Sequence, residues 1–138
     1  MKLLIITCGT EGDTRPLAAL GHALMQDGHE VELLGDANTL GIAQVLGVPA
    51  RALAGDIRAT IAAEGAMREI TRNLARLAIA HSSDWLQQAI DAGRGCDAII
   101  ASGLAVFAGL SAAEALRVPA IGAMLIPISP TSAFASPF

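Results

Sequence analysis

Residues 2–16, KLLIITCGTEGDTRP, decide the fold of this chain. Residues 2–8 form a short apolar run that stops at Gly9, which is typical of a parallel strand buried on both faces. A glycine-broken loop over residues 9–16 follows, and residues 17–26 have the apolar spacing of a helix. Thr14 is the expected N-cap of that helix, with Pro16 in its first turn. The stretch therefore predicts a strand–loop–helix unit.

The same kind of unit recurs along the chain. Further strands are expected over residues 30–34, 48–53, 97–101 and 119–126, and helical segments over residues 38–46, 57–92 and 105–116. Gly65 and the polar stretch at residues 81–84 are expected to divide the long helical segment. Repeated units of this kind predict right-handed crossovers and an α/β, Rossmann-like three-layer domain with a mostly parallel sheet and the first strand at its centre.

Ligands of such sheets bind beyond the carboxyl ends of the strands. The chemistry is therefore expected in five loops, which are residues 9–15, 35–38, 53–58, 102–104 and 127–132. We expect the Rossmann-like domain to cover residues 1–126. Residues 127–138, which contain three prolines and show no periodicity, are expected to be a loop or a truncated linker.

Composition excludes several classes of protein. The chain has 138 residues, of which 53% are hydrophobic, and a net charge of −4, so disorder and a nucleic-acid partner are not expected. The longest uncharged stretch, residues 98–113, is shorter than the ~18 residues that a membrane span needs.

The two cysteines, Cys8 and Cys96, are too few for a disulfide scaffold, which favours a cytoplasmic protein. Neighbouring strands could bring the two close together, but two buried thiols are expected.

The loop at residues 9–16 does not have the glycine spacing of a dinucleotide fingerprint or of a phosphate-binding loop. A helix N-terminus attracts phosphate, but Glu11 and Asp13 place two carboxylates there, and they would repel it. The loop therefore suits a neutral partner such as a hydroxyl group.

Several motifs carry a resemblance to a family. They are residues 7–31, TCGTEGDTRPLAALGHALMQDGHEV, followed by Gly47-Val48-Pro49, Ser102-Gly103-Leu104 and Arg117-Val118-Pro119. In this order they resemble the N-terminal domain of UDP-glycosyltransferases that include the sterol glucosyltransferases and the glycopeptide-antibiotic glycosyltransferases. The resemblance implies the GT-B fold, in which two Rossmann-like halves face each other across a cleft. It covers only the first half, which binds the acceptor.

The resemblance also implies roles for individual residues. Asp13 would be the general base that takes the proton of the acceptor hydroxyl while the sugar leaves its nucleotide with inversion. Thr10 and Gly12 would shape the loop and contact the acceptor, and Ser102 and Gly103 would line its pocket. From the residues alone, Asp13 could equally be a helix cap, and the other four could be plain turn and loop residues. The family usually has Arg at the position of Glu11.

The expected partners follow from the same resemblance. They are a small-molecule hydroxyl acceptor, such as a lipid, sterol or natural product, and a C-terminal domain, in cis or in trans, that binds the nucleotide-sugar donor. No cofactor or metal is expected in this half, and the chain alone is expected to be inactive. The alternative is a non-enzymatic, flavodoxin-like α/β binding module. If Asp13 is only a cap, His81 is the next candidate for the base.

Overall fold

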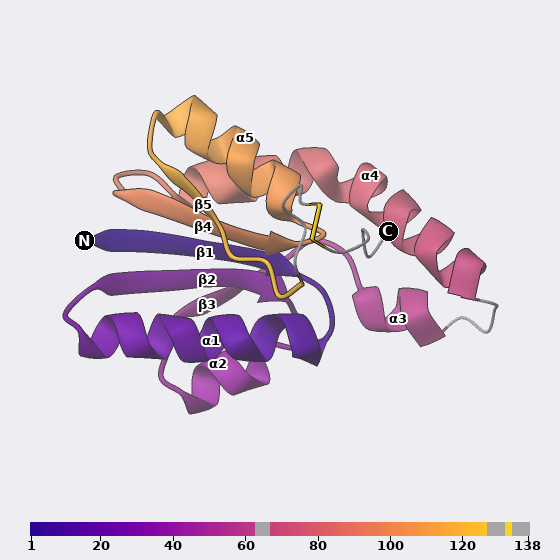
Figure 1. Ribbon diagram of the computed structural model, residues 1–138, viewed down its shortest axis with the longest axis horizontal. Coiled ribbons are helices and arrows are strands. Elements are labelled where there is room, and N and C mark those ends of the chain that lie inside the picture. Colours follow the sequence, from indigo (N-terminus) through magenta and orange to yellow (C-terminus); the bar gives the residue numbers. More distant parts are fainter. Residues whose placement is uncertain (63–66, 127–131, 134–138) are drawn as a thin grey trace.

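The computed structural model describes residues 1–62, 67–126 and 132–133. Strands and helices alternate along this part of the chain (Figure 1). Their order is β1 (Lys2–Cys8), α1 (Glu11–Gln26), β2 (Glu30–Asp36), α2 (Gly41–Val45), β3 (Ala50–Leu53), α3 (Ile57–Ala62), α4 (Met67–Ala92), β4 (Ala98–Gly103), α5 (Val106–Leu116) and β5 (Ala120–Gly122).

The strands form one sheet in the order β3-β2-β1-β4-β5, and every pairing is parallel. The first strand is central, as predicted, with Ile5 lying opposite Leu33 of β2 and Ile100 of β4. The chain builds outward from β1 to β3 and then returns to the other side of β1 for β4. This reversal places a topological switch point between β1 and β4, where ligands of such sheets bind.

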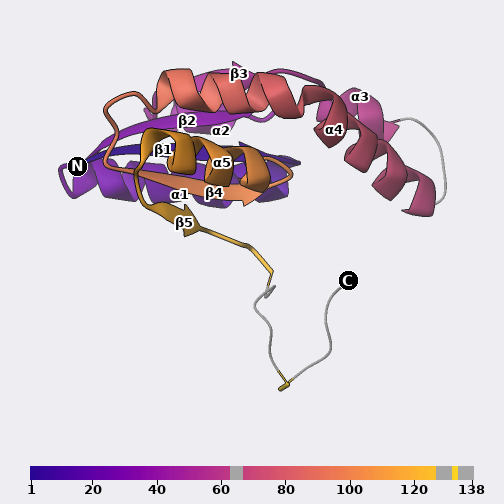
Figure 2. The same ribbon diagram turned by 90° about the horizontal axis from the view of Figure 1, so that it is seen from above.

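Each face of the sheet has its own hydrophobic core. Ile5 packs with Leu17 of α1 on one face, and Ile6 packs with Trp85 of α4 and Ala112 of α5 on the other. Alternate residues of β1 therefore enter opposite cores, which explains why its apolar run is nearly continuous. Figure 2 shows α4 on the opposite side of the sheet from α1. The α/β, three-layer architecture predicted from the sequence is confirmed.

The first helix begins earlier than its apolar pattern predicts. Thr10, not Thr14, is the N-cap residue of α1, with an extended backbone at φ −76° and ψ −179°. Residues 11–16 are therefore helical and not a loop, and Pro16 lies inside the helix. The Thr14 side chain is buried, with its hydroxyl oxygen 2.8 Å from the Thr39 hydroxyl oxygen. The N-terminal turn carries no apolar stripe, so the periodicity could not show it.

The predicted break at residues 81–84 is wrong, because α4 continues through it. The predicted break at Gly65 lies outside the described residues. The Ser82 hydroxyl donates to the Ile79 carbonyl at 2.9 Å, so this polar side chain is satisfied without ending the helix. Figure 1 shows α3 and the first turns of α4 extending past the carboxyl ends of the strands.

Cys8 and Cys96 are both buried and free, as expected, but they do not approach each other. Cys8 ends β1, whereas Cys96 precedes the start of β4, so in a parallel sheet they lie at opposite ends. Among the described helices none is long and apolar enough to cross a membrane. The segment expected to be a linker, residues 127–138, lies outside the described residues except for 132–133.

Candidate functional site

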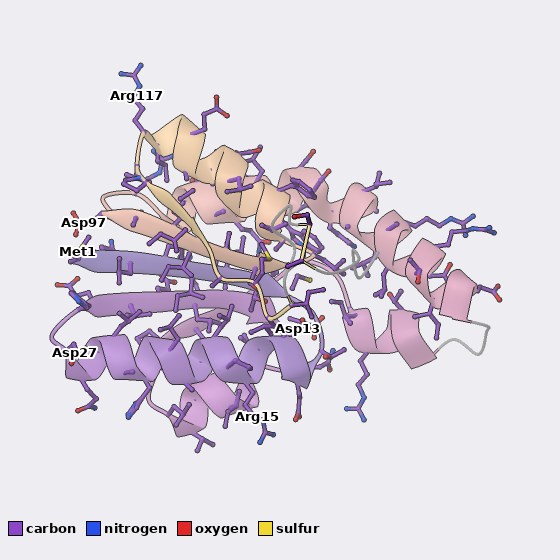
Figure 3. The ribbon with its side chains drawn as sticks, viewed as in Figure 1. Met1, Asp13, Arg15, Asp27, Asp97 and Arg117 are labelled. Carbon is purple, nitrogen blue, oxygen red and sulfur yellow. The ribbon has the colours of Figure 1, made fainter. Side chains whose placement is uncertain are left out.

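A cavity of about 450 Å³ opens beyond the carboxyl ends of β1 and β4. Four of the residues singled out from the sequence line it, namely Thr10, Asp13, Ser102 and Gly103. Figure 3 shows Asp13 at the start of α1, beside the ends of the strands. The described residues that line it are Cys8, Gly9, Thr10, Asp13, Ile57, Leu74, Ser102, Gly103, Leu104, Val106, Phe107, Met124, Leu125 and Ile126. The cavity thus combines one carboxylate and two hydroxyl groups with a mostly apolar wall.

The Asp13 side chain is half-buried and is held by Thr10. Its Oδ2 accepts the backbone N–H of Thr10 at 2.7 Å and the Thr10 hydroxyl at 3.1 Å. This is the carboxylate half of a capping box, in which the third residue of a helix bonds back to the N-cap. Asp13 therefore caps the helix, although through Thr10 and not through the residues that follow it. Both bonds use the same oxygen, so capping does not occupy Oδ1.

Ser102 and Gly103 reach the cavity from the end of β4. Ser102 is 1% exposed and lies opposite Thr7 of β1, whose hydroxyl is buried without a hydrogen-bond partner among the described residues. Gly103 adopts a left-handed backbone at φ +60°, and a Cβ there would lie 2.6 Å from the Cys8 carbonyl oxygen. Gly103 is therefore needed both for its conformation and for the close approach of β4 to β1.

The Cys8 thiol lies in the cavity wall. Burial first, and then the negative charges of Asp36 and Asp13, raise the pKa of this thiol to about 12. At neutral pH the thiol is protonated, so it contributes an apolar surface and not a nucleophile.

A second cavity, of about 370 Å³, lies beside the first and shares Gly9, Thr10 and Ile57 with it. Its wall includes Asp36, a carboxylate only 2% exposed that the sequence analysis did not single out. Asp36 accepts the backbone N–H groups of Asn38 and Ile57, both at 2.9 Å. It joins the end of β2 to the start of α3. The sequence could have indicated Asp36 by its place two residues after the apolar run at residues 30–34.

Two other candidates lie away from the first cavity. Gly12 is an exposed residue in the first turn of α1 and does not line it. His81 stacks on Trp85, with ring centroids 6.3 Å apart, and its Nδ1 lies 3.5 Å from Asp84 Oδ2. Within the part of the chain that the structure describes, no three His, Cys, Asp or Glu side chains gather where they could hold a metal ion.

Comparison with known proteins places this geometry in a family. Residues 3–135 match the model of the glycosyltransferase family 28 N-terminal domain. The chain is 33% identical over 141 aligned residues to a sterol 3-beta-glucosyltransferase of Eremothecium gossypii, covering 97% of this chain and 11% of that protein. It is 31% identical to the dTDP-epi-vancosaminyltransferase of Amycolatopsis orientalis, covering 86% of this chain and 30% of that protein.

Solved structures give the same fold. The calicheamicin glycosyltransferase CalG4 superimposes with a TM-score of 0.76 at 13% identity, covering 97% of this chain and 34% of that one. SsfS6, a glycosyltransferase of Streptomyces sp. SF2575, gives a TM-score of 0.68 at 23% identity, covering 94% of this chain and 41% of that one. The chain thus spans from about a tenth to two fifths of the lengths of these four proteins. It belongs to the glycosyltransferase family 28 N-terminal domain family, with the Rossmann-like half of a GT-B fold.

Proposed function

We propose that this domain binds the acceptor of an inverting glycosyltransferase and that Asp13 is the general base. The observation that carries the proposal is the place of Asp13, which is the one carboxylate among the described residues that lines the 450 Å³ cavity at the switch point. An alcohol is a weak nucleophile, and a carboxylate within hydrogen-bonding distance of its proton assists its attack.

The proposed step balances as follows. The proton of the acceptor hydroxyl passes to Asp13 Oδ1, the oxygen that Thr10 leaves free. The acceptor oxygen attacks the anomeric carbon of the sugar and forms the new C–O bond. The bond between that carbon and the nucleotide diphosphate breaks, and its electron pair leaves with the diphosphate. Attack from the face opposite the leaving group inverts the anomeric configuration.

The walls of the cavity support an apolar alcohol as the acceptor. Ile57, Leu74, Leu104, Val106 and Phe107 contribute aliphatic or aromatic surface around the carboxylate and the hydroxyl groups of Thr10 and Ser102. A lipid, a sterol or a natural product would bury its body against this surface and keep its hydroxyl beside Asp13. The names of the relatives, a sterol glucosyltransferase among them, are consistent with this class.

The donor, which we propose is a UDP-sugar, would be bound by a second domain in cis or in trans. Glu11 and Asp13 stand at the N-terminus of α1, where a phosphate group would otherwise bind. The free thiols of Cys8 and Cys96 fit the reducing cytoplasm. The alternative of a flavodoxin-like binding module gains no support from the family match.

The test uses Asp13→Asn in the assembled enzyme, meaning this domain together with its donor-binding domain. Asn keeps an oxygen for the Thr10 N–H but removes the base, so kcat should fall by ~10²–10⁴-fold. Glu11→Gln is the matched control, because it removes one negative charge from the same helical turn at a side chain that is 68% exposed and paired with Arg15. Its kcat should stay at the wild-type value. Equal kcat values for wild type and Asp13→Asn would rule out Asp13 as the base.

A further inference from the structure

We propose that Gly9 is a positioning residue for Asp13. A methyl group at Gly9 would overlap Asp13 Oδ2 and Cγ and would lie 2.6 Å from Asp13 Cβ. The first two atoms could swing away by rotation of the side chain. The Cβ atom could not, because the backbone of α1 fixes it. Any side chain at residue 9 would therefore displace Asp13 or the first turn of the helix.

The conformation of Gly9 does not explain the glycine. The glycines with positive φ among the described residues are Gly28, Gly47, Gly55, Gly95 and Gly103, and Gly9 is not one of them. An alanine could adopt its backbone angles. The space taken by the Asp13 side chain is the constraint that the structure shows at this position.

This contact determines which carboxylate oxygen faces the reaction. Asp13 lies back against Gly9 and so brings Oδ2 to 2.7 Å from the Thr10 nitrogen and 3.1 Å from its hydroxyl oxygen. Oδ1 is then the oxygen that accepts the proton. The assignment of a catalytic consequence to Gly9 rests on the proposed function, whereas its contact with Asp13 does not.

The first experiment therefore measures the contact without any catalysis. The melting temperature of the 138-residue chain is compared for Gly9→Ala in the wild-type background and in an Asp13→Gly background, where the obstructing side chain is gone. We expect Gly9→Ala to lower the melting temperature clearly in the wild-type background and markedly less in the Asp13→Gly background. If the Gly9→Ala variant does not fold but the double variant with Asp13→Gly does, the result supports the proposal, because removal of the Asp13 side chain then rescues folding. An equal loss in both backgrounds would overturn the proposal.

Gly12→Ala is the matched control for that series. Gly12 lies in the first turn of α1, next to Asp13 in the sequence. The methyl group that alanine adds there would meet only the Thr10 hydroxyl oxygen, at 3.4 Å. Because alanine favours a helix more than glycine does, the melting temperature should stay constant or rise slightly.

The second experiment measures turnover in the assembled enzyme. Gly9→Ala should lower kcat by ~10²-fold, the usual effect of a misplacement of about 1 Å, with little change in KM. Combined with Asp13→Asn it should cause no further loss, because Gly9 acts through Asp13. A multiplied loss in the double variant would mean a role independent of Asp13 and would contradict the proposal. If Asp13→Asn itself leaves kcat intact, the proposed function fails while the stability coupling still tests the contact.

Discussion

The backbone N–H of Thr10 and the carboxylate of Asp13 close the first turn of α1, with 2.7 Å between the nitrogen and Oδ2. One interaction thus ends the loop after β1, caps a helix, and fixes the carboxylate in the wall of the cavity. Capping and catalysis, which the sequence presents as alternatives for Asp13, are compatible because they use different oxygens of the same group.

The Thr10 hydroxyl should contribute only modestly to the stability of the domain, because the Thr10 backbone N–H also bonds to Asp13. Thr10→Val removes the 3.1 Å bond to Asp13 Oδ2 but keeps the N–H bond, so we expect a loss of about 1 kcal/mol in the free energy of unfolding. Thr10→Ser keeps the hydroxyl and should remain close to wild type. Urea denaturation of the three proteins checks this order, and a Thr10→Ser loss as large as that of Thr10→Val would contradict it.

The domain without a donor-binding partner should not bind a sugar nucleotide measurably. The motivation is the pair of carboxylates, Glu11 and Asp13, in the first turn of α1, at the position where a phosphate would meet free N–H groups. Calorimetric titration of the 138-residue chain with UDP-glucose should give no heat of binding. A micromolar dissociation constant would show that this half holds the donor, and the division of roles between the halves would have to be revised.

The strands could be predicted because a buried parallel strand is a short apolar run in the sequence, and the central place of the first strand was predicted with them. The run at residues 2–8 matches β1 to the residue. The start of α1 could not be predicted in this way, since its first turn is stabilised by Thr10 and Asp13 and not by an apolar stripe. The edge strand β5 is shorter than the pattern over residues 119–126, because it pairs with β4 alone and its last pair, Gly122 with Ala101, lies two residues before the end of β4.

The candidate site was predictable where a loop ends a central strand. Thr10, Asp13, Ser102 and Gly103 follow the carboxyl ends of predicted parallel strands, and they line one cavity because the structure places β4 beside β1. The role of Gly9 could not be read from the sequence, since it depends on where a side chain four residues further along the chain folds back. Asp36 was missed for a similar reason, because its partner Ile57 is far away in the sequence.

Asp36 should be important for stability. Each of its oxygens accepts a backbone N–H group, that of Ile57 buried and that of Asn38 part-buried, so Asp36→Asn would place an NH₂ group against one of those donors. We expect the free energy of unfolding to fall by about 1–3 kcal/mol. Asp27→Asn, at the exposed C-cap of α1, is the control and should change little. The fluorescence of Trp85, the only tryptophan, which is 1% exposed, reports unfolding in both. An Asp36→Asn variant as stable as the wild type would contradict this expectation, because the N–H group facing the new NH₂ would then have another acceptor, such as water.

The stability of the domain should fall in alkali because of Cys8. Burial first, and then the charges of Asp36 and Asp13, raise the pKa of the folded thiol from 9.0 to about 12. Between those values the unfolded chain loses the thiol proton while the folded chain keeps it, so rising pH favours unfolding. The slope from this one proton is at most about 1.4 kcal/mol per pH unit. Below about pH 9 the contribution is constant, because the thiol is protonated in both states.

Cys8→Ala isolates that contribution from every other group that titrates in alkali, the Cys96 thiol included, because both proteins carry those groups. At neutral pH the variant should be the less stable protein, since it leaves a small cavity in the wall below Gly9. As the pH rises from neutral to about 11, its free energy of unfolding should fall less steeply than that of the wild type, and the two curves should converge. Urea denaturation followed by Trp85 fluorescence measures both curves. Parallel curves would show that the folded thiol ionises at the same pH as the unfolded one, and that it is more open to solvent than its buried place at the end of β1 implies.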